Sequence, residues 1–342
     1  MYVGGAGMKS MTSWERVEAA LHGAEVDRIP VGMWKHWHLQ DRTPGRLAEL
    51  NLALQRQFDT DLIKLTPGNL TYVQDWGGTI KFGTHDDDIS LAVQPAVASA
   101  AQWTDLPRLD VHRGALGREL ETIRLTAAGV GGAVPVLMTV FSPLTVAHKL
   151  AGDGTSGRRI VDDLRQAPRQ VHAGLARIAD VLRDYVAACL QAGADAFFFA
   201  TQLAYDELLS RDEYQEFGVR YDLRVLEAML GKSRLTMLHL CKGRRLMFDL
   251  LQEYPVDAIS WAHGTSQPSL SEARRLTKKA LATGVSLQTL HEGTESDVFA
   301  EARAAIAEAG RRGFLLAPAC VIKATAPDGN LRAMRRAAEP ES

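Results

Sequence analysis

The feature that most constrains the fold is a regular alternation of short apolar segments with amphipathic segments along the chain. The apolar segments are predicted β-strands, because they are too short for buried helices and are bounded by turn residues. They cover residues 27–34, 61–65, 134–141, 194–200, 235–241, 258–261, 285–290 and 314–317. The predicted helices cover residues 14–21, 44–58, 116–128, 167–191, 206–230, 244–253, 270–281, 295–311 and 330–338. Eight strands alternating with helices, without an obvious linker, predict an α/β fold of the (β/α)8 TIM-barrel type in a single domain.

Two parts of the chain fall outside this alternation. Residues 1–11 are rich in glycine and are predicted to form a flexible tail ahead of a barrel domain at residues 12–342. The run from Thr12 to Glu15 has the form of a capping box, which predicts the start of the first helix. Between residues 67 and 114, short alternating runs are interrupted by glycines and acidic residues. This pattern predicts an insertion after the second strand that contains a β-hairpin.

Two residue types that bind soft metals end the predicted strand 235–241. Residues i and i+2 of a strand point to the same face, so His239 and Cys241 emerge side by side. A second thiol, Cys320, follows the strand 314–317, and in a barrel both strand ends open onto the catalytic face. Nitrogen and sulfur ligands suit Zn²⁺, and three protein ligands leave one position open, as in catalytic zinc sites. We therefore predict a zinc site formed by His239, Cys241 and Cys320.

The alternative for any free cysteine is a role as a small buried hydrophobic residue. Cys189 lies within an Ala-rich helical segment and is assigned to that role. His263 and His291 follow the sixth and seventh predicted strands and are candidates for catalytic acid or base, with a plain rim position as the alternative. The remaining residues expected to bind substrate or wall the pocket are Trp34, His36, His38, Trp76, Phe141 and Gln202.

Composition narrows the range of partners. With 342 residues, of which 46% are hydrophobic and 23% charged, the chain can bury a large core. Its formal net charge of −2 offers no attraction for nucleic acid or for an anionic membrane. No apolar run approaches the roughly 20 residues needed to span a bilayer. We therefore expect a cytoplasmic protein, monomeric or homodimeric, whose few cysteines serve metal binding or catalysis more readily than disulfides.

Several segments resemble the uroporphyrinogen decarboxylase superfamily nearly from end to end. The similar segments are residues 15–17, 27–31, 193–202, 255–261, 313–320 and 330–334. Within that superfamily, His239-x-Cys241 together with Cys320 is similar to the zinc motif of the corrinoid-dependent methyltransferases, which move a methyl group from methylcobalamin to coenzyme M. The resemblance implies a barrel fold, Zn²⁺ and a methylcobalamin carried by a separate corrinoid protein. No corrinoid-binding Asp-x-His-x-x-Gly motif occurs in this chain.

The pocket segments depart from both branches of the superfamily. Residues 33–38 lack the Arg-Gln-Ala-Gly-Arg motif by which true uroporphyrinogen decarboxylases hold a polycarboxylate, and no Asp stands near residues 66–68. Decarboxylation of uroporphyrinogen is therefore not expected. Residues 288–294 replace the Gly-rich sequence usual in the methyltransferases, and His263 stands where relatives commonly have Asp. The metal ligands thus resemble the family while the pocket does not, which leaves coenzyme M open as the acceptor.

These observations predict a zinc-dependent methyl transfer to a thiol. A zinc ion held by two thiolates and one imidazole can bind a substrate thiol, lower its pKa and present it as a zinc thiolate to an electrophilic methyl group. His263 or His291 would accept the released proton or orient the acceptor. Two alternatives remain. One is a lyase or hydrolase of the same fold with zinc as Lewis acid on a small molecule, and the other is a non-catalytic metal-binding barrel.

Overall fold

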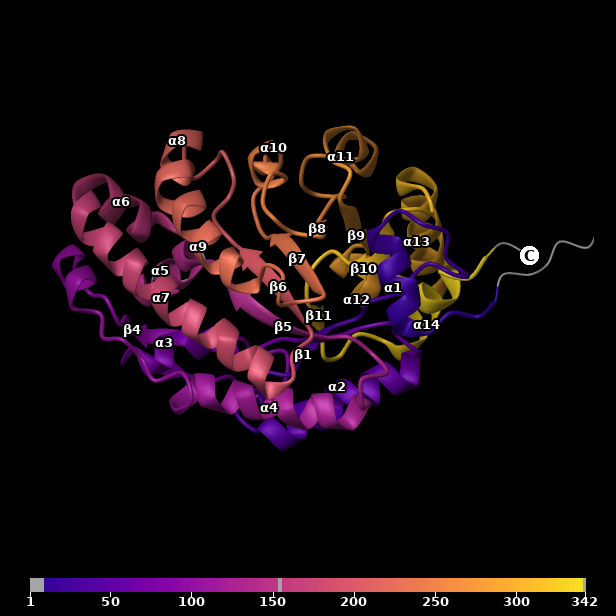
Figure 1. The fold of residues 1–342 in the computed structure, drawn as a ribbon, viewed down its shortest axis with the longest axis horizontal. Helices are drawn as coiled ribbons and strands as arrows, with labels where there is room; N and C mark the ends of the chain where they lie inside the picture. Colours follow the sequence, from indigo (N-terminus) through magenta and orange to yellow (C-terminus); the bar gives the residue numbers. More distant parts are fainter. Residues whose placement is uncertain (1–8, 153–155, 341–342) are drawn as a thin grey trace, which may run out of the picture.

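The computed structural model describes residues 9–152 and 156–340, and its centre is a parallel sheet that curls into a barrel (Figure 1). Seven strands pair in the order β10-β9-β8-β7-β6-β5-β2, each parallel to its neighbour. Val31 bridges Leu316 of β10, and Gly32 bridges Leu62 beside β2, so residues 31–32 close the ring. The strands are β2 (Ile63–Leu65), β5 (Val136–Phe141), β6 (Ala196–Thr201), β7 (Leu235–Leu240), β8 (Ala258–Trp261), β9 (Ala280–Val285) and β10 (Phe314–Pro318). The fold is the (β/α)8 TIM barrel that the sequence predicts.

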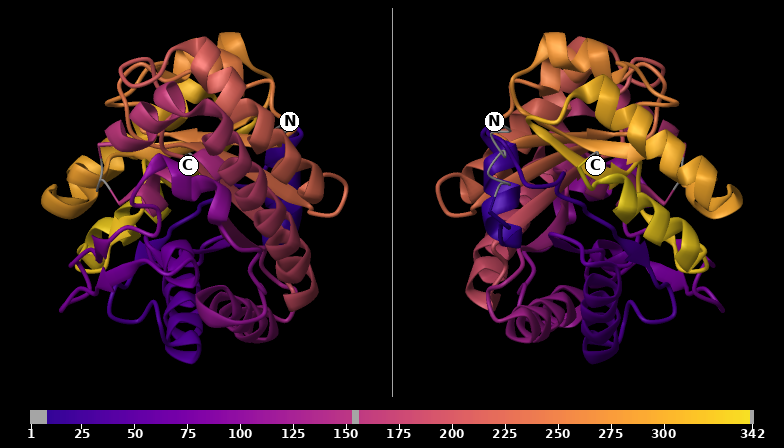
Figure 2. Two further views of the ribbon diagram at one scale, coloured as in Figure 1. Left: turned by 90° about the vertical axis from the view of Figure 1, so that its left-hand side faces the viewer. Right: turned by 90° about the vertical axis from the view of Figure 1, so that its right-hand side faces the viewer.

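Helices surround the barrel and cover its outer face (Figures 1 and 2). The helices with more than one or two turns are α1 (Ser13–Leu21), α2 (Pro44–Phe58), α4 (Gly114–Val130), α5 (Pro143–Ala151), α6 (Arg158–Gln166), α7 (Pro168–Ala192), α9 (Arg220–Met229), α11 (Leu270–Leu276), α13 (Glu295–Ala309) and α14 (Asp328–Ala337). Helices α2 and α4 pack side by side below the strands in both views of Figure 2. Every residue of β5, β6 and β7 is buried, as expected for parallel strands covered by helices. Within the described ranges, no helix has both the length and the apolar character needed to cross a membrane.

The predicted insertion after the second strand is confirmed. It contains the short helix α3 (Thr71–Asp75), the antiparallel hairpin β3 (Thr79–Lys81) and β4 (Leu91–Gln94), and the 3-10 helix η1 (Ala100–Asp105). Asp86, between the two hairpin strands, accepts hydrogen bonds from the backbone N–H groups of His38 and Leu39, both at 3.2 Å. The insertion therefore holds the loop that follows the first strand.

A second contact places the same loop at the mouth of the barrel. The two-residue strand β1 (Lys35–His36) pairs in parallel with β11 (Ile322–Lys323), which follows β10. The predicted strand 27–34 is therefore reduced to the bridging residues 31–32, and β1 begins after it. As a result, His36 lies beside the segment that contains Cys320.

The first helix begins as the sequence predicts. Thr12 is the N-cap of α1, and a reciprocal capping box joins it to Glu15. The Met11 backbone N–H donates to Asp27 Oδ2 at 2.8 Å, so contact with the barrel already exists at residue 11. Residues 1–8 of the predicted tail lie outside the described residues.

The predicted strand 285–290 is wrong. The strand is β9, which ends at Val285, and the next residues form the helix α12 (Leu287–Glu292). The Ala-rich run that becomes β9 has helix propensity, which extended the predicted helix 270–281 beyond the true end of α11 at Leu276. All six residues of β9 are buried between β8 and β10, so tertiary packing overrides that propensity. Ser286 then caps α12, and His291 lies in the last turn of a helix instead of at a strand end.

The segments between β6 and β8 also differ from their predicted lengths. The predicted helix 206–230 is a continuous helical run made of α8 (Arg211–Tyr214), a π-helical turn η2 (Gln215–Val219) and α9. The predicted helix 244–253 is reduced to α10 (Phe248–Leu251). Residues 241–247 instead form the loop at the end of β7, which leaves room for side chains at the barrel mouth.

Candidate active site

His239, Cys241 and Cys320 converge at the C-terminal mouth of the barrel. His239 lies near the end of β7, Cys241 directly follows β7, and Cys320 follows β10. Their ligand atoms lie within 4.8 Å of one another, and the two Sγ atoms are 4.0 Å apart. Two thiolates bound at about 2.3 Å to one tetrahedral zinc ion lie about 3.8 Å apart. The spacing of the two thiols therefore fits the predicted zinc site.

The imidazole of His239 is oriented as in a metal-binding histidine. Its Nδ1 lies 3.1 Å from the Oγ of Ser260 on β8, and its ring centroid is 5.0 Å from that of Phe198. Its Nε2 is buried and makes no hydrogen bond within the ranges that the structure describes. An imidazole with one nitrogen held by a neighbour and the other left for a ligand is the usual arrangement at zinc. The donor set and the unpaired buried nitrogen both fit a zinc ion.

The two thiols of the cluster ionise unequally. The hydrogen bond from Cys241 lowers the pKa of Cys320 well below its ordinary value, and His239 adds to this effect. The same hydrogen bond, together with burial, raises the pKa of Cys241. Cys320 is therefore the thiol of the pair that ionises more readily, and a bound cation would favour ionisation of both.

A cavity of about 120 Å³ adjoins this cluster. Its lining includes the three predicted ligands and four of the predicted pocket residues, Trp34, His36, Phe141 and Gln202. Several lining residues carry a buried polar atom that has no hydrogen-bond partner in the described parts of the chain: Trp34 Nε1, Asn69 Oδ1, Gln202 Oε1 and His239 Nε2. Buried polar atoms are normally paired, so unpaired atoms around one cavity mark it as the place for a ligand.

Two buried lysines line the same cavity, and the sequence prediction missed both. Lys64 on β2 donates to Thr66 Oγ1 at 2.9 Å, and its Nζ lies 4.4 Å from the ring centroid of Phe198. Burial lowers the pKa of Lys64 to about 7 and the pKa of Lys149, on α5, to about 8. The sequence did contain a signal for these residues, because Lys64 and Lys149 each stand within an apolar run. Lysine is almost never fully buried without a partner, so a lysine in such a run indicates a binding partner.

Two of the predicted pocket residues lie outside the lining of this cavity. Trp76 is buried in the insertion, where its Nε1 donates to the carbonyl of Pro107 at 3.1 Å. His38 is also buried, and it lies beside Asp41 in the loop after β1. Trp76 therefore holds the insertion together, and His38 belongs to a second cluster of metal-binding side chains with His36 and Asp41.

The two predicted catalytic histidines also lie outside that lining. His263 follows β8, and its Nδ1 lies 3.1 Å from Thr283 Oγ1 on β9. Burial lowers the pKa of His263, and the charges of Glu308 and Glu301 on α13 oppose that effect. His291 is in α12, and its Nδ1 is buried without a hydrogen-bond partner among the described residues. A catalytic role for either histidine stays a prediction.

Cys189 occupies the position expected for a packing residue. It is fully buried in α7, and burial raises its pKa. A buried thiol with a raised pKa carries little thiolate and is a poor metal ligand. The three cysteines thus divide into two at the barrel mouth and one in the core.

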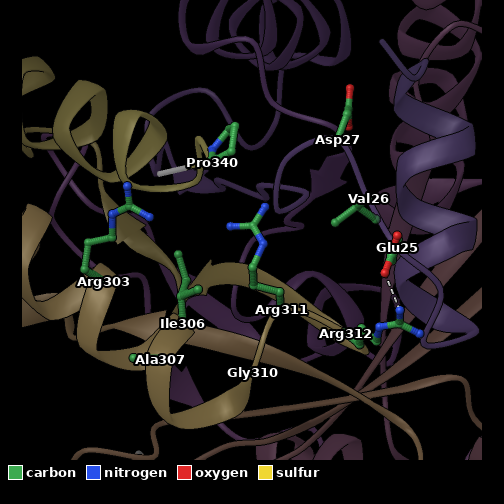
Figure 3. A pocket seen from close by; sticks show the side chains of 10 residues that line it. All are labelled: Glu25, Val26, Asp27, Arg303, Ile306, Ala307, Gly310, Arg311, Arg312 and Pro340. Atoms are coloured by element: carbon green, nitrogen blue, oxygen red, sulfur yellow. Dashed lines mark hydrogen bonds and ion pairs between the residues drawn. The ribbon is translucent and has the colours of Figure 1, made fainter. Parts of the chain in front are cut away.

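A larger cavity of about 880 Å³ lies at the opposite end of the barrel (Figure 3). It is lined by residues of α13, by 25–27 and by 310–312, which precede the first and last strands. Figure 3 shows Arg312 paired with Glu25, while the guanidinium group of Arg311 lies between residue 26 and α13. Its described lining contains no histidine or cysteine, and barrel chemistry belongs to the C-terminal face. The candidate active site is therefore the smaller cavity at the mouth.

The fold and the ligand cluster at its mouth define a (β/α)8-barrel protein with its site on the C-terminal face. The chain belongs to the uroporphyrinogen decarboxylase family, since the family described as Uroporphyrinogen decarboxylase (URO-D) matches residues 12–340. This match, with the relatives below, confirms the resemblance found in the sequence.

Two relatives and one solved structure cover both branches of the family. The methylcobamide:CoM methyltransferase MtbA of Methanosarcina acetivorans is 23% identical over 96% of this chain and 97% of its own. The uroporphyrinogen decarboxylase of Syntrophotalea carbinolica is 29% identical over 57% of each chain. The solved structure of a methyltransferase from Methanosarcina mazei has a TM-score of 0.80 at 22% identity and covers 96% of this chain and 98% of its own. Similarity to the methyltransferases thus extends over the whole barrel.

Proposed function

We propose that the protein transfers a methyl group from a methylated corrinoid, carried by a separate protein, to a thiol bound at His239, Cys241 and Cys320. The observation that carries this proposal is the convergence of three soft ligand atoms within 4.8 Å beside a buried cavity. The near full-length similarity to methylcobamide:CoM methyltransferases supports it.

Different residues of the chain would have different roles in this reaction. His239, Cys241 and Cys320 would hold zinc, which when bound lowers the pKa of a substrate thiol so that the thiolate forms at neutral pH. Ser260 keeps the imidazole of His239 in place. The aromatic side chain of Phe141 walls the cavity and keeps water from the reacting groups.

We further propose that the acceptor is a small thiol with an anionic group. Lys64 and Lys149 both line the cavity, and no carboxylate occurs among the described residues that line it. Because burial lowers the pKa of Lys64 to about 7 and that of Lys149 to about 8, a bound sulfonate or carboxylate would favour the protonated form of both, and such a pairing is stronger in a desolvated pocket than in water. Coenzyme M, the acceptor named for the relatives, is one thiol of this class.

Methyl transfer is tested by incubating the zinc-loaded protein with methylcobalamin and following its demethylation optically. The thiols compared are coenzyme M and 3-mercaptopropionate, which are anionic, 2-mercaptoethanol, which is neutral, and cysteamine, which is cationic. We expect turnover with the anionic thiols and little with the cationic one. Absence of demethylation with every thiol would contradict the proposal.

A parallel assay separates the two branches of the family. We expect no coproporphyrinogen from uroporphyrinogen, because the loop at residues 33–38 contains no arginine to hold the substrate carboxylates. Measurable decarboxylation would assign the protein to the other branch.

A further inference from the structure

A second group of metal-binding side chains lies in the loop between β1 and α2. His36, His38 and Asp41 offer ligand atoms that all lie within 4.8 Å of one another. His36 Nε2 is 3.0 Å from Asp41 Oδ2, and His38 Nδ1 is 3.7 Å from the same oxygen. The two imidazole rings are tilted by 32° with their centroids 3.8 Å apart, and both rings lie beside the carboxylate of Asp41.

The contacts within this group leave some of its buried polar atoms without a hydrogen-bond partner. His38 and Asp41 are each only 8% exposed, yet His38 Nδ1 and Asp41 Oδ1 have no hydrogen-bond partner in the described parts of the chain. A buried histidine–carboxylate pair kept only for stability would leave few such atoms, because each costs about 1–3 kcal/mol when left unpaired. The two unpaired atoms therefore call for a ligand.

The surroundings hold the loop in this arrangement before any ligand binds. The hairpin residue Asp86 accepts from the backbone N–H groups of His38 and Leu39, both at 3.2 Å. Gly68 approaches the carboxylate so closely that a Cβ at this position would lie 3.1 Å from Asp41 Oδ2. Since the backbone at Gly68 is not in the left-handed region, this close approach is a reason for glycine there.

We propose that His36, His38 and Asp41 form a second metal site, for a divalent first-row transition ion such as Zn²⁺ or Fe²⁺. Two imidazoles and one carboxylate are a ligand set that such ions prefer. Ligand atoms bound at about 2.0–2.2 Å to one tetrahedral ion lie about 3.3–3.6 Å apart. The 3.0 Å separation lies slightly below this range and the 3.7 Å separation slightly above it, so small movements of His36 and His38 complete the site.

The second site borders the first but does not depend on it. His36 lines the cavity beside Cys241 and Cys320, whereas His38 and Asp41 lie outside its lining. An ion held here would therefore lie against the wall of the same cavity and could contact a ligand in it. The inference rests on the geometry of the loop and not on the proposed methyl transfer.

Metal counting on the full chain tests the proposal. The protein is stripped with a chelator, titrated with Zn²⁺ and analysed for bound metal, and the titration is repeated with Co²⁺ as a spectroscopic probe. We expect two equivalents in the wild type and one in the variant with Cys241→Ala and Cys320→Ala. His38→Ala should also bind one equivalent and keep the thiolate-to-cobalt absorption, which the double cysteine variant loses.

Two further variants keep the result decisive. His172→Ala is a matched control, because His172 also pairs with a carboxylate, Glu216, at 3.0 Å, but without a second imidazole. It should keep both equivalents. His36→Gln replaces His38→Ala if the latter fails to fold, as judged by circular dichroism, and should likewise lose one equivalent.

The outcomes separate this inference from the proposed function. Full metal content in both His38→Ala and His36→Gln, or a single equivalent in the wild type that only the cysteine substitutions remove, overturns the second site. A single equivalent that survives the cysteine substitutions and is lost in His38→Ala supports the second site and removes the basis of the proposed methyl transfer.

Discussion

The two ends of the barrel differ in whether their buried polar groups have hydrogen-bond partners. At the N-terminal end of the strands, Asp61 is fully buried and both of its carboxylate oxygens are used. Arg16 and Arg28 each donate to it at 2.5 Å, and the backbone N–H of Val31 donates at 2.8 Å. At the C-terminal end, the buried side chains of His239 and Gln202 keep unpaired atoms beside the cavity.

The difference separates groups that hold the fold from groups that await a ligand. A buried charge is tolerated when it is fully paired, and losing one partner is strongly destabilising. An unpaired buried atom costs stability and persists where a substrate or a metal ion completes it. Substitutions at the N-terminal end should therefore change stability, and those at the mouth should change binding and activity.

The largest effect should come from the thiols at the mouth. Cys241→Ala or Cys320→Ala should each remove the zinc equivalent held by the thiolates and reduce methyl transfer to the rate without protein, because two ligands hold the ion poorly. Metal analysis and the methylcobalamin assay measure both. Cys189→Ala should keep the zinc content of the wild type, and the same undiminished content in both Cys241→Ala and Cys320→Ala would disprove the site.

The next effect should appear at the opposite end, in stability. Asp61→Ala leaves Arg16 and Arg28 buried without their shared carboxylate, which should lower the free energy of unfolding by about 3–5 kcal/mol. Asp59→Asn is the control, since Asp59 also pairs with Arg28 but its side chain is 72% exposed, and asparagine tolerates the left-handed backbone of this position. It should cost at most about 1 kcal/mol. Urea denaturation measures both, and equal costs would argue against the contrast between paired and exposed charges.

A smaller effect on binding should follow from Ser260→Ala. Without the Oγ that holds Nδ1 of His239, zinc affinity should fall by about 10–100-fold while folding stays intact. Ser233, which contacts Thr236 at the other end of β7, provides the matched substitution Ser233→Ala. A competition titration with a zinc indicator should show a change only for Ser260.

The ion pairs at the N-terminal end of the barrel should also control the stability of the fold at low pH. Although burial opposes it, the hydrogen bonds from Arg16 hold the pKa of Asp27 well below its ordinary value. A depressed carboxyl pKa stabilises the fold above the unfolded value of about 3.9, and this contribution is lost as pH falls below it. The urea midpoint should therefore drop between about pH 5 and pH 3. Asp27→Asn should be less stable at pH 7 and show a shallower drop, and an unchanged profile would contradict this linkage.

The smallest effect should come from the two histidines outside the cavity lining. A general base at the reacting atoms contributes about 10²- to 10⁴-fold to the rate. Neither His263 nor His291 lines the cavity, so His263→Ala and His291→Ala should reduce turnover only a few-fold and leave zinc bound. A loss of 10²-fold or more in either variant would restore the catalytic role predicted from the sequence.

Much of the barrel could be predicted because strand and helix periodicities are local. The helix 44–58 and the strand 258–261 match the structure residue for residue. The largest error is at β9, whose first residues, Ala280 and Leu281, have helix propensity but are buried between two strands. Propensity is a property of the run itself, whereas burial between β8 and β10 is decided by the rest of the barrel.

The convergence of His239, Cys241 and Cys320 could be predicted for a related reason. His239 and Cys241 share a face because a strand alternates its side chains, and that rule needs no tertiary information. Cys320 is 79 residues from Cys241 in sequence, and their meeting was expected because all barrel strands end on one face. The rule that the strands of a barrel end on one face was therefore enough to predict this contact.

What the sequence alone determined is most of the strands and helices, the barrel class and the convergence of His239, Cys241 and Cys320 at its mouth. Only the tertiary structure decided that Lys64 and Lys149 face the cavity and that Asp41 turns back onto His36 and His38. The loop of Asp41 is held by Asp86, far along the chain in the insertion, and by the pairing of β1 with β11. The physical reason is that desolvation and hydrogen-bond pairing depend on contacts between distant segments, whereas strand and helix patterns depend on neighbours in sequence.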